Sequence, residues 1–141
     1  MKKICKFSVW LMCVLSLAGC GKNMADVTID YGDSRLYTTQ DMDAAISLIE
    51  TTFATWKGCD LHRISYISDE ECNADNIAWM NDLRAPDDMQ ETFTECIAFT
   101  SEFHSPKKGG GAWNADTEYT GWKWWLARSD GGEWKLMTWG Y

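Results

Sequence analysis

The residue types that could move a proton are few in this sequence. It contains two histidines, His62 and His104. His62 follows Asp60 by two positions, and residues two apart in a β-strand point to the same face of a sheet. A carboxylate that orients an imidazole makes a general base, so Asp60 and His62 are the candidate catalytic pair. A single strand histidine beside an arginine is more often exposed or structural, and no further catalytic residue is indicated.

Sequence motifs for metal, phosphate or hydrolytic chemistry are missing. Cys59 and His62 have a C-x-x-H spacing, but no paired Cys or His motif completes a zinc site, and strand residues three apart point to opposite faces. The sequences G-x-S-x-G and H-E-x-x-H do not occur, and the glycines at 109–111 do not lead from a strand into a helix as a phosphate loop must. We therefore predict no metal and no cofactor.

Aromatic residues give a second kind of candidate site. The segment GWKWWLARSDGGEWKLMTWGY at the C-terminus holds five of the nine tryptophans. Sugars stack on exposed aromatic rings, so Trp113, Tyr119 and Trp125 are the candidate ligand-binding residues for a glycan. Large aromatic side chains also fill protein cores. A ligand platform and a core of unusual composition are therefore both open for this segment.

The N-terminal sequence MKKICKFSVWLMCVLSLAGC has the composition of an export signal. Lysines precede an apolar run that is too short to span a bilayer. The following Leu17-Ala18-Gly19-Cys20 resembles the lipobox of bacterial lipoproteins. That resemblance implies cleavage before Cys20, attachment of diacylglyceryl and palmitate chains to it, and a place on the extracytoplasmic face of the cell membrane. We predict a signal peptide over 1–19, a lipidated cysteine and tether over 20–30, and one domain over 31–141.

The negative net charge of the chain excludes some classes of binding partner. The formal net charge of −8 becomes −11 once residues 1–19 are removed, because they contain three lysines and no acidic residue. So acidic a surface repels phosphate backbones, which argues against nucleic-acid binding and against a polybasic grip on anionic lipid. Cys59, Cys72 and Cys96 permit one disulfide outside the cytoplasm, but the sequence does not choose the pair.

The strongest structural pattern lies in YTTQDMDAAISLIETTFATWKG. Thr38 is a natural N-cap, Asp41 completes a capping box, and Gly58 supplies a left-handed stop. Between these signals the apolar residues recur at three and four, as one face of a helix requires: Met42, Ala45, Ile46, Ile49, Phe53 and Trp56. Upstream, residues 27–31 alternate, and they either add an edge strand or only lie against the domain.

The rest of the chain alternates between strand and helix patterns. Residues 59–67 have the content of a strand, a capping box at Ser68–Glu71 opens a second helix, and Pro86 ends that helix by Ala85. A long strand follows over 93–103, with a second face of small residues. The segment HSPKKGGGAWNADTEY then has the composition of a mobile loop.

The C-terminal segment is predicted as a hairpin. Asp130-Gly131 is the preferred pair of a two-residue type I′ turn, which sets Arg128 opposite Glu133. This register places two groups on opposite faces: first Trp122, Trp124, Leu126, Lys135, Met137 and Trp139, and second Trp125, Ala127, Trp134 and Leu136. The order helix, strand, helix, strand, strand, strand, with no parallel βαβ series, predicts an α+β fold with a curved antiparallel sheet packed on two helices.

Four segments, IDYGDSRLYTTQDMDAAI, FATWKGCDLHRISY, NADTEYTGWKWWLAR and EWKLMTWGY, together resemble a family of small Gram-positive lipoproteins without an assigned function. The junction Gly58-Cys59 and the ending Trp139-Gly140-Tyr141 are the most specific elements. This family is similar to the nuclear transport factor two superfamily, which implies a cone-like α+β fold. The resemblance supplies no catalytic residues.

These observations favour a noncatalytic binding or interaction domain on a lipid anchor. The predicted hairpin has apolar residues on both faces, and the helices can cover only one of them. We therefore expect a second copy or an envelope protein to cover the other face. Two alternatives stay open: a carbohydrate-binding module that uses the C-terminal aromatics, and a cone-fold enzyme that uses the Asp60 and His62 pair.

Overall fold

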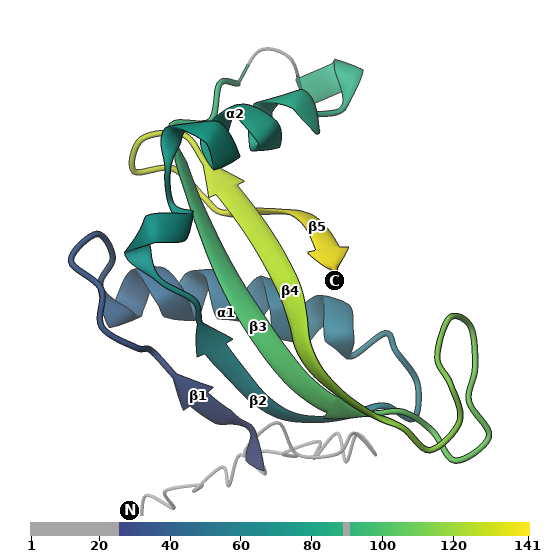
Figure 1. The fold of residues 1–141 in the computed structure, drawn as a ribbon. Coiled ribbons are helices and arrows are strands. Elements are labelled where there is room, and N and C mark those ends of the chain that lie inside the picture. Colours follow the sequence, from purple (N-terminus) through teal and green to yellow (C-terminus); the bar gives the residue numbers. More distant parts are fainter. Residues whose placement is uncertain (1–25, 89–90) are drawn as a thin grey trace, which may run out of the picture.

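The computed structural model describes residues 26–88 and 91–141 (Figure 1). The predicted signal peptide, Cys20 and most of the tether lie outside these residues. The elements follow in the order β1 (Thr28–Asp30), α1 (Thr39–Phe53), β2 (Asp60–Tyr66), the 3-10 turn η2 (Asp69–Glu71), α2 (Ala74–Asp82), the 3-10 turn η3 (Pro86–Asp88), β3 (Glu95–His104), β4 (Glu118–Arg128) and β5 (Lys135–Gly140).

The five strands form one open sheet in the order β1-β2-β3-β4-β5. This establishes the α+β class, but the sheet is mixed rather than wholly antiparallel, because β1 pairs parallel with β2. The expectation of an antiparallel sheet was therefore wrong at β1, which α1 connects to β2 as a single parallel crossover. A strand of three residues carries too little alternation to be identified as a parallel partner. β1 also lies inside the segment predicted as tether.

Helix α1 forms as its pattern predicts. Thr38 and Asp41 make both hydrogen bonds of the capping box, and five residues of the apolar stripe are buried. The helix nevertheless ends at Phe53, five residues before Gly58. Gly58 does adopt the left-handed conformation, at the point where the chain turns toward β2 beside Pro106. Trp56 therefore leaves the helix and packs against the core from the connecting turn.

The second helix begins later than predicted. Ser68 makes no side-chain cap, and Asp69 to Glu71 form only the turn η2. The cap of α2 is Asn73, whose side-chain oxygen accepts the N–H of Asn76 at 2.9 Å. The Asp69 carboxylate instead accepts hydrogen bonds from segments far along the chain, including the hydroxyl of Ser34 at 2.6 Å. A tertiary contact thus replaces the local capping box. The helix ends at Asp82, before Pro86, as predicted.

Two cores lie on opposite faces of the sheet. Helix α1 runs behind the sheet and α2 crosses its top end in Figure 1. The face toward α1 holds the larger core, with Ile64, Phe99 and Trp124 at its centre. The face toward α2 holds a smaller core, in which Cys96 and Ala98 of β3 pack against Met80. The small residues predicted for the second face of β3 are thus the surface against which α2 packs.

The predicted hairpin register was wrong. Trp124 pairs with Trp139 and Leu126 with Leu136, and the register shifts between Trp125 and Leu126. Of the two central turn residues only Gly131 has a positive φ, of 63°, whereas a type I′ turn needs both. Trp134 and Leu136 consequently lie on the α1 face, while Met137 joins Trp125 and Ala127 on the α2 face.

The segment between β3 and β4 is tied together by hydrogen bonds. The buried Ser105 hydroxyl donates to the carbonyl of Asn114 at 2.6 Å and accepts the N–H of Thr117 at 2.9 Å. The N–H groups of Gly109 and Asp116 both donate to the carbonyl of Pro106. The composition that indicated a loop is correct, but these bonds give the loop a defined shape.

Candidate functional site

Nine aromatic rings form a continuous cluster on the α1 face of the sheet. Helix α1 and the turn after it supply two rings, β3 one, the loop after β3 one, and β4 with the C-terminal segment the other five. We call this set the aromatic cluster: Phe53, Trp56, Phe103, Trp113, Tyr119, Trp122, Trp124, Trp139 and Tyr141.

Trp56 is the centre of the aromatic cluster. Its ring stacks on Trp124 with centroids 5.1 Å apart, and it lies 4.8 Å from Trp113 and 6.4 Å from Trp139. Phe103 fills the space beside it, and Tyr119 stacks on Phe103 at 5.0 Å. The rings thus occupy the space between the end of α1 and the sheet, where Phe53, Phe103 and Trp124 are buried and most of the others are half-buried.

One edge of the cluster reaches the surface. Trp139 is 44 % exposed and the C-terminal Tyr141 is 78 % exposed. Tyr141 meets the half-buried Trp122 edge to face at 5.1 Å. The indole N–H of Trp122 is buried and has no hydrogen-bond partner among the described residues. We call Trp122, Trp139 and Tyr141 the aromatic rim.

The structure brings together two of the three predicted ligand-binding residues. Trp113 and Tyr119 contact each other at 5.5 Å and both adjoin the rim through Trp122. Trp125 lies elsewhere: it is buried on the α2 face, with its ring 5.3 Å from that of Trp79. Sequence reasoning missed Trp139 and Tyr141 as site residues, although the C-terminal position of Tyr141 was a signal of exposure.

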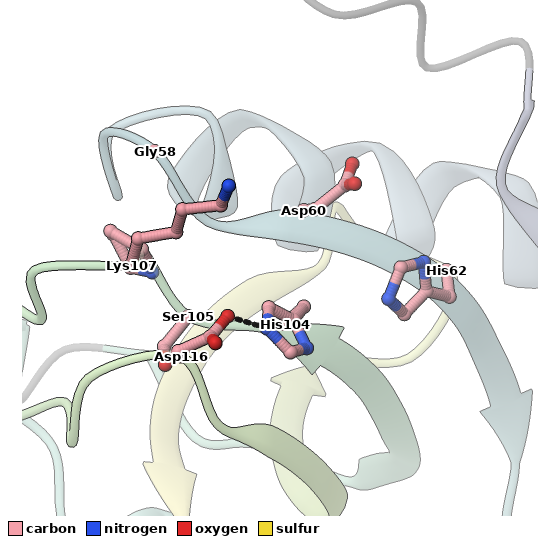
Figure 2. Close-up of a pocket in the computed structure, with 8 residues that line it drawn as sticks. Gly58, Asp60, His62, His104, Ser105, Lys107 and Asp116 are labelled. Atoms are coloured by element: carbon pink, nitrogen blue, oxygen red, sulfur yellow. Dashed lines mark hydrogen bonds and ion pairs between the residues drawn. The ribbon is translucent and has the colours of Figure 1, made fainter.

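A polar pocket of about 340 Å³ lies at the other end of β2 and β3 from α2 (Figure 2). The strand pairs Asp60 with His104 and His104 with Glu118 place these residues on the face opposite Leu61, Phe103 and Tyr119. The pocket is therefore on the outside of the sheet, away from α1. Its lining residues are Gly58, Asp60, His62, His104, Ser105, Pro106, Lys107 and Asp116.

His104 is held between two carboxylates at the edge of this pocket. Its Nε2 lies 2.8 Å from Asp116 and its Nδ1 lies 2.9 Å from Glu118. The Glu118 carboxylate is also 3.4 Å from Nε2 of His62. Hydrogen bonds that the ring donates to Asp116 and then to Glu118 raise the pKa of His104 above its usual value. A protonated His104 thereby fastens the start of β4 to the end of β3.

The predicted catalytic pair lines this pocket, on the face of the sheet that points away from α1. Asp60 and His62 are on the same side of β2, as their spacing predicts. Figure 2 shows the Asp60 carboxylate pointing away from His104 and Asp116, and the His62 side chain is 44 % exposed. A general base and its orienter work best where water is excluded. The geometry provides a polar surface pocket in which both histidines already lie beside carboxylates.

Among the described residues, the cysteines do not form a metal site with the histidines. Cys59 packs at the margin of the α1-side core, whereas His62 lines the outer pocket, so the C-x-x-H pair lies on opposite faces. In the ranges 26–88 and 91–141, no group of three or more His, Cys, Asp or Glu side chains is arranged to hold a metal ion. Cys59, Cys72 and Cys96 are free thiols.

Comparisons of the chain with protein-family models, curated protein sequences and solved structures find no match. The resemblance to the lipoprotein family and to the cone-shaped superfamily therefore stays a prediction. Among the helices of the described residues, none has the length and apolar character needed to cross a membrane.

Proposed function

We propose that this chain is a lipid-anchored lipoprotein of the extracytoplasmic membrane face, and that its domain binds cell-wall glycan without catalysis. The observation that carries the proposal is the exposure of Trp139 and Tyr141 at the edge of an aromatic cluster whose inner rings are buried. Exposed aromatic rings that rest on a rigid core lose little entropy when a ligand stacks on them. Sugar rings present apolar C–H faces that suit such stacking.

The buried donor of Trp122 supports the same ligand class. An unsatisfied buried N–H costs about 1–3 kcal/mol, and an incoming hydroxyl oxygen would supply the missing acceptor. Tyr141 lies over Trp122 and is held by ring contacts at the chain terminus. A polyhydroxylated ligand could stack on the exposed rings through its C–H faces and accept the indole N–H of Trp122 through a hydroxyl oxygen.

Fluorescence titration tests the rim as a binding surface. The full chain in detergent is titrated with soluble cell-wall glycan fragments while tryptophan emission is followed. We expect saturable binding that weakens roughly tenfold in Trp139→Ala and in Tyr141→Ala, since a stacked aromatic contact contributes on the order of 1 kcal/mol.

Trp79 offers a matched control for this titration. It is 39 % exposed, close to the 44 % of Trp139, but it lies on α2 against the opposite face of the sheet. Trp79→Ala should bind glycan as the unchanged chain does. Equal losses in Trp79→Ala and Trp139→Ala, or no saturable binding by the unchanged chain, would refute the rim as a glycan site.

The anchor has its own test. Cys20 precedes the described domain by few residues, and the lipobox resemblance makes it the lipid attachment residue. Changing Cys20 to Ala should move the protein from the membrane fraction to the soluble extracytoplasmic fraction, because two or more acyl chains are needed for stable attachment. Membrane fractionation of Cys20→Ala and of Cys13→Ala, as control, measures this. Retention of Cys20→Ala on membranes contradicts the anchor.

A catalytic role for Asp60 and His62 is the weaker alternative. The pocket contains both residues, which is the arrangement that such a role requires. However, its histidines already pair with Glu118 and Asp116, and the pocket is open on the outer face. We therefore assign binding, rather than catalysis, to the domain.

A further inference from the structure

Cys72 and Cys96 meet between the two cores, although 24 positions separate them in the sequence. Cys72 follows the turn η2, and Cys96 is the second residue of β3. The Cys96 thiol donates to the carbonyl of Glu71 at 3.7 Å, the residue directly before Cys72. Cys72 also packs against the small core that contains Cys96. The two free thiols thus belong to the same small core, one on each side of the Glu71 carbonyl.

The third cysteine is too far away to compete. Cys59 precedes β2 and Cys72 follows it, so the seven residues of this strand separate them by about 20 Å. Cys96 is at the same end as Cys72, because Tyr66 at the end of β2 pairs with Phe99. The pairing that the sequence left open therefore has a single geometric answer.

The surroundings give the two thiols different reactivity. Cys72 is half-buried, and the hydroxyl of Tyr66 lies 3.5 Å from its sulfur. The hydrogen bond from Cys96, followed by that from Tyr66, lowers the pKa of Cys72. Cys96 is fully buried, and its contact with the Cys72 sulfur raises its pKa. Burial raises the pKa of Cys59 as well, so Cys72 is the one of the three that most readily forms a thiolate.

We propose that Cys72 and Cys96 form a redox-active dithiol that closes to a disulfide by exchange with a disulfide oxidant. The Cys72 thiolate attacks one sulfur of the oxidant, and the other sulfur leaves as a thiolate. Cys96 then gives up its proton to that thiolate and attacks the Cys72 sulfur, which releases the second oxidant sulfur. The cysteines lose two electrons and the oxidant becomes two thiols.

The disulfide ties the turn before α2 to β3. It closes a segment that contains all of α2, which otherwise rests on the sheet through the small core around Met80. The proposal depends on the proposed function only for the location outside the cytoplasm, where disulfides persist. The chemistry itself can be tested in vitro without a glycan and without a membrane location.

Peptide mapping tests the pairing directly. The full chain, reduced and then freed of reductant in detergent, is exposed to oxidised glutathione, alkylated and digested with trypsin. Cleavage after Lys57, Arg63, Arg84 and Lys107 places each of the three cysteines on a separate peptide. We expect a disulfide between peptides 64–84 and 85–107, with peptide 58–63 alkylated. Alkylated Cys72 and Cys96 after oxidation, or a link to Cys59, would overturn the proposal.

Single substitutions separate the two roles. In Cys96→Ser, Cys72 should accumulate as the mixed disulfide with glutathione several times faster than Cys59, whereas Cys72→Ser should leave Cys96 unmodified. Cys59→Ser is the matched control and should still form the cross-link. Glutathione on Cys59 in preference to Cys72 contradicts the assigned roles.

A thermal melt of the unchanged chain, with and without reductant, tests the cross-link without relying on variants that could misfold. Closing the loop should raise the melting temperature by about 10 °C, and an unchanged melting temperature counts against a cross-link in the folded chain.

Discussion

At the scale of single residues, His104 makes the main polar contacts at the edge of the outer pocket. The imidazole joins β3 to the loop before β4 through Asp116 and to β4 itself through Glu118. Each of these carboxylates favours the charged ring, so the pKa of His104 is raised. The remaining charged or titratable groups that line the pocket are Asp60, His62 and Lys107.

The raised pKa of His104 predicts a pH dependence of defined sign. A group whose pKa is higher in the folded state stabilises that state below its unfolded pKa, and this stabilisation is lost as pH rises through the folded pKa. The clamp should therefore hold below pH 6.5, the ordinary histidine value, and loosen above the folded value. NMR titration of the His104 ring should give a midpoint above 6.5 that falls in Asp116→Asn and Glu118→Gln. A midpoint at or below 6.5 in the unchanged chain would contradict the clamp.

At the scale of elements, the hairpin between β4 and β5 shows that the type of turn determines how the two strands pair. The Ser129 carbonyl accepts the N–H of Gly132 at 2.9 Å, and Gly131 alone of the central pair is left-handed. This is the pattern of a type II turn. The strands then pair one or two residues away from the register of a type I′ turn, which returns Trp134 to the α1 face.

This turn assignment can be checked by two substitutions. Gly131→Ala should lower the free energy of unfolding by about 1 kcal/mol, because a Cβ is unfavourable at positive φ, and nothing lies within 4 Å to add a clash. Asp130→Ala should have a much smaller effect, since Asp130 does not have a positive φ. Urea denaturation of both variants measures the difference, and equal losses would indicate a type I′ turn instead.

At the scale of the whole molecule, the domain depends on rings that come from distant parts of the chain. Trp56 follows α1, Phe103 is the last residue but one of β3, and Trp124 lies within β4. Contacts among them join the helix to the sheet near the aromatic rim. The rim is thereby supported by the same cluster that stabilises the fold.

Removing the central ring should therefore affect the fold more than removing a rim ring. Trp56→Ala should lower the free energy of unfolding by about 3 kcal/mol through lost contacts and the cavity left behind. Trp139→Ala should cost much less, because this side chain is 44 % exposed. Urea denaturation followed by circular dichroism compares them. If both variants unfold at the same urea concentration, Trp56 is not the centre of the cluster.

Local signals in the sequence determined the elements whose stabilising contacts are themselves local. The capping residues Thr38 and Asp41 and the apolar stripe fixed the start and the buried face of α1. The alternation in residues 97–103 likewise indicated both faces of β3, whereas Phe93 was assigned to the wrong face: it precedes the strand and packs with Cys96 and Ala98. Asp60 and His62 were correctly placed on one side of a strand, since period-two geometry needs no knowledge of neighbours.

Tertiary structure decided everything that depends on pairing between distant segments. Asp69 bonds to Ser34 and so leaves Asn73 to cap α2. The register of β5 chose which tryptophans are core, and the pairing of β2 with β3 placed Cys72 beside Cys96 and Asp60 beside His104. A one-residue change in register exchanges the faces of a strand, so residue types alone could suggest the candidate side chains but not the sites they form.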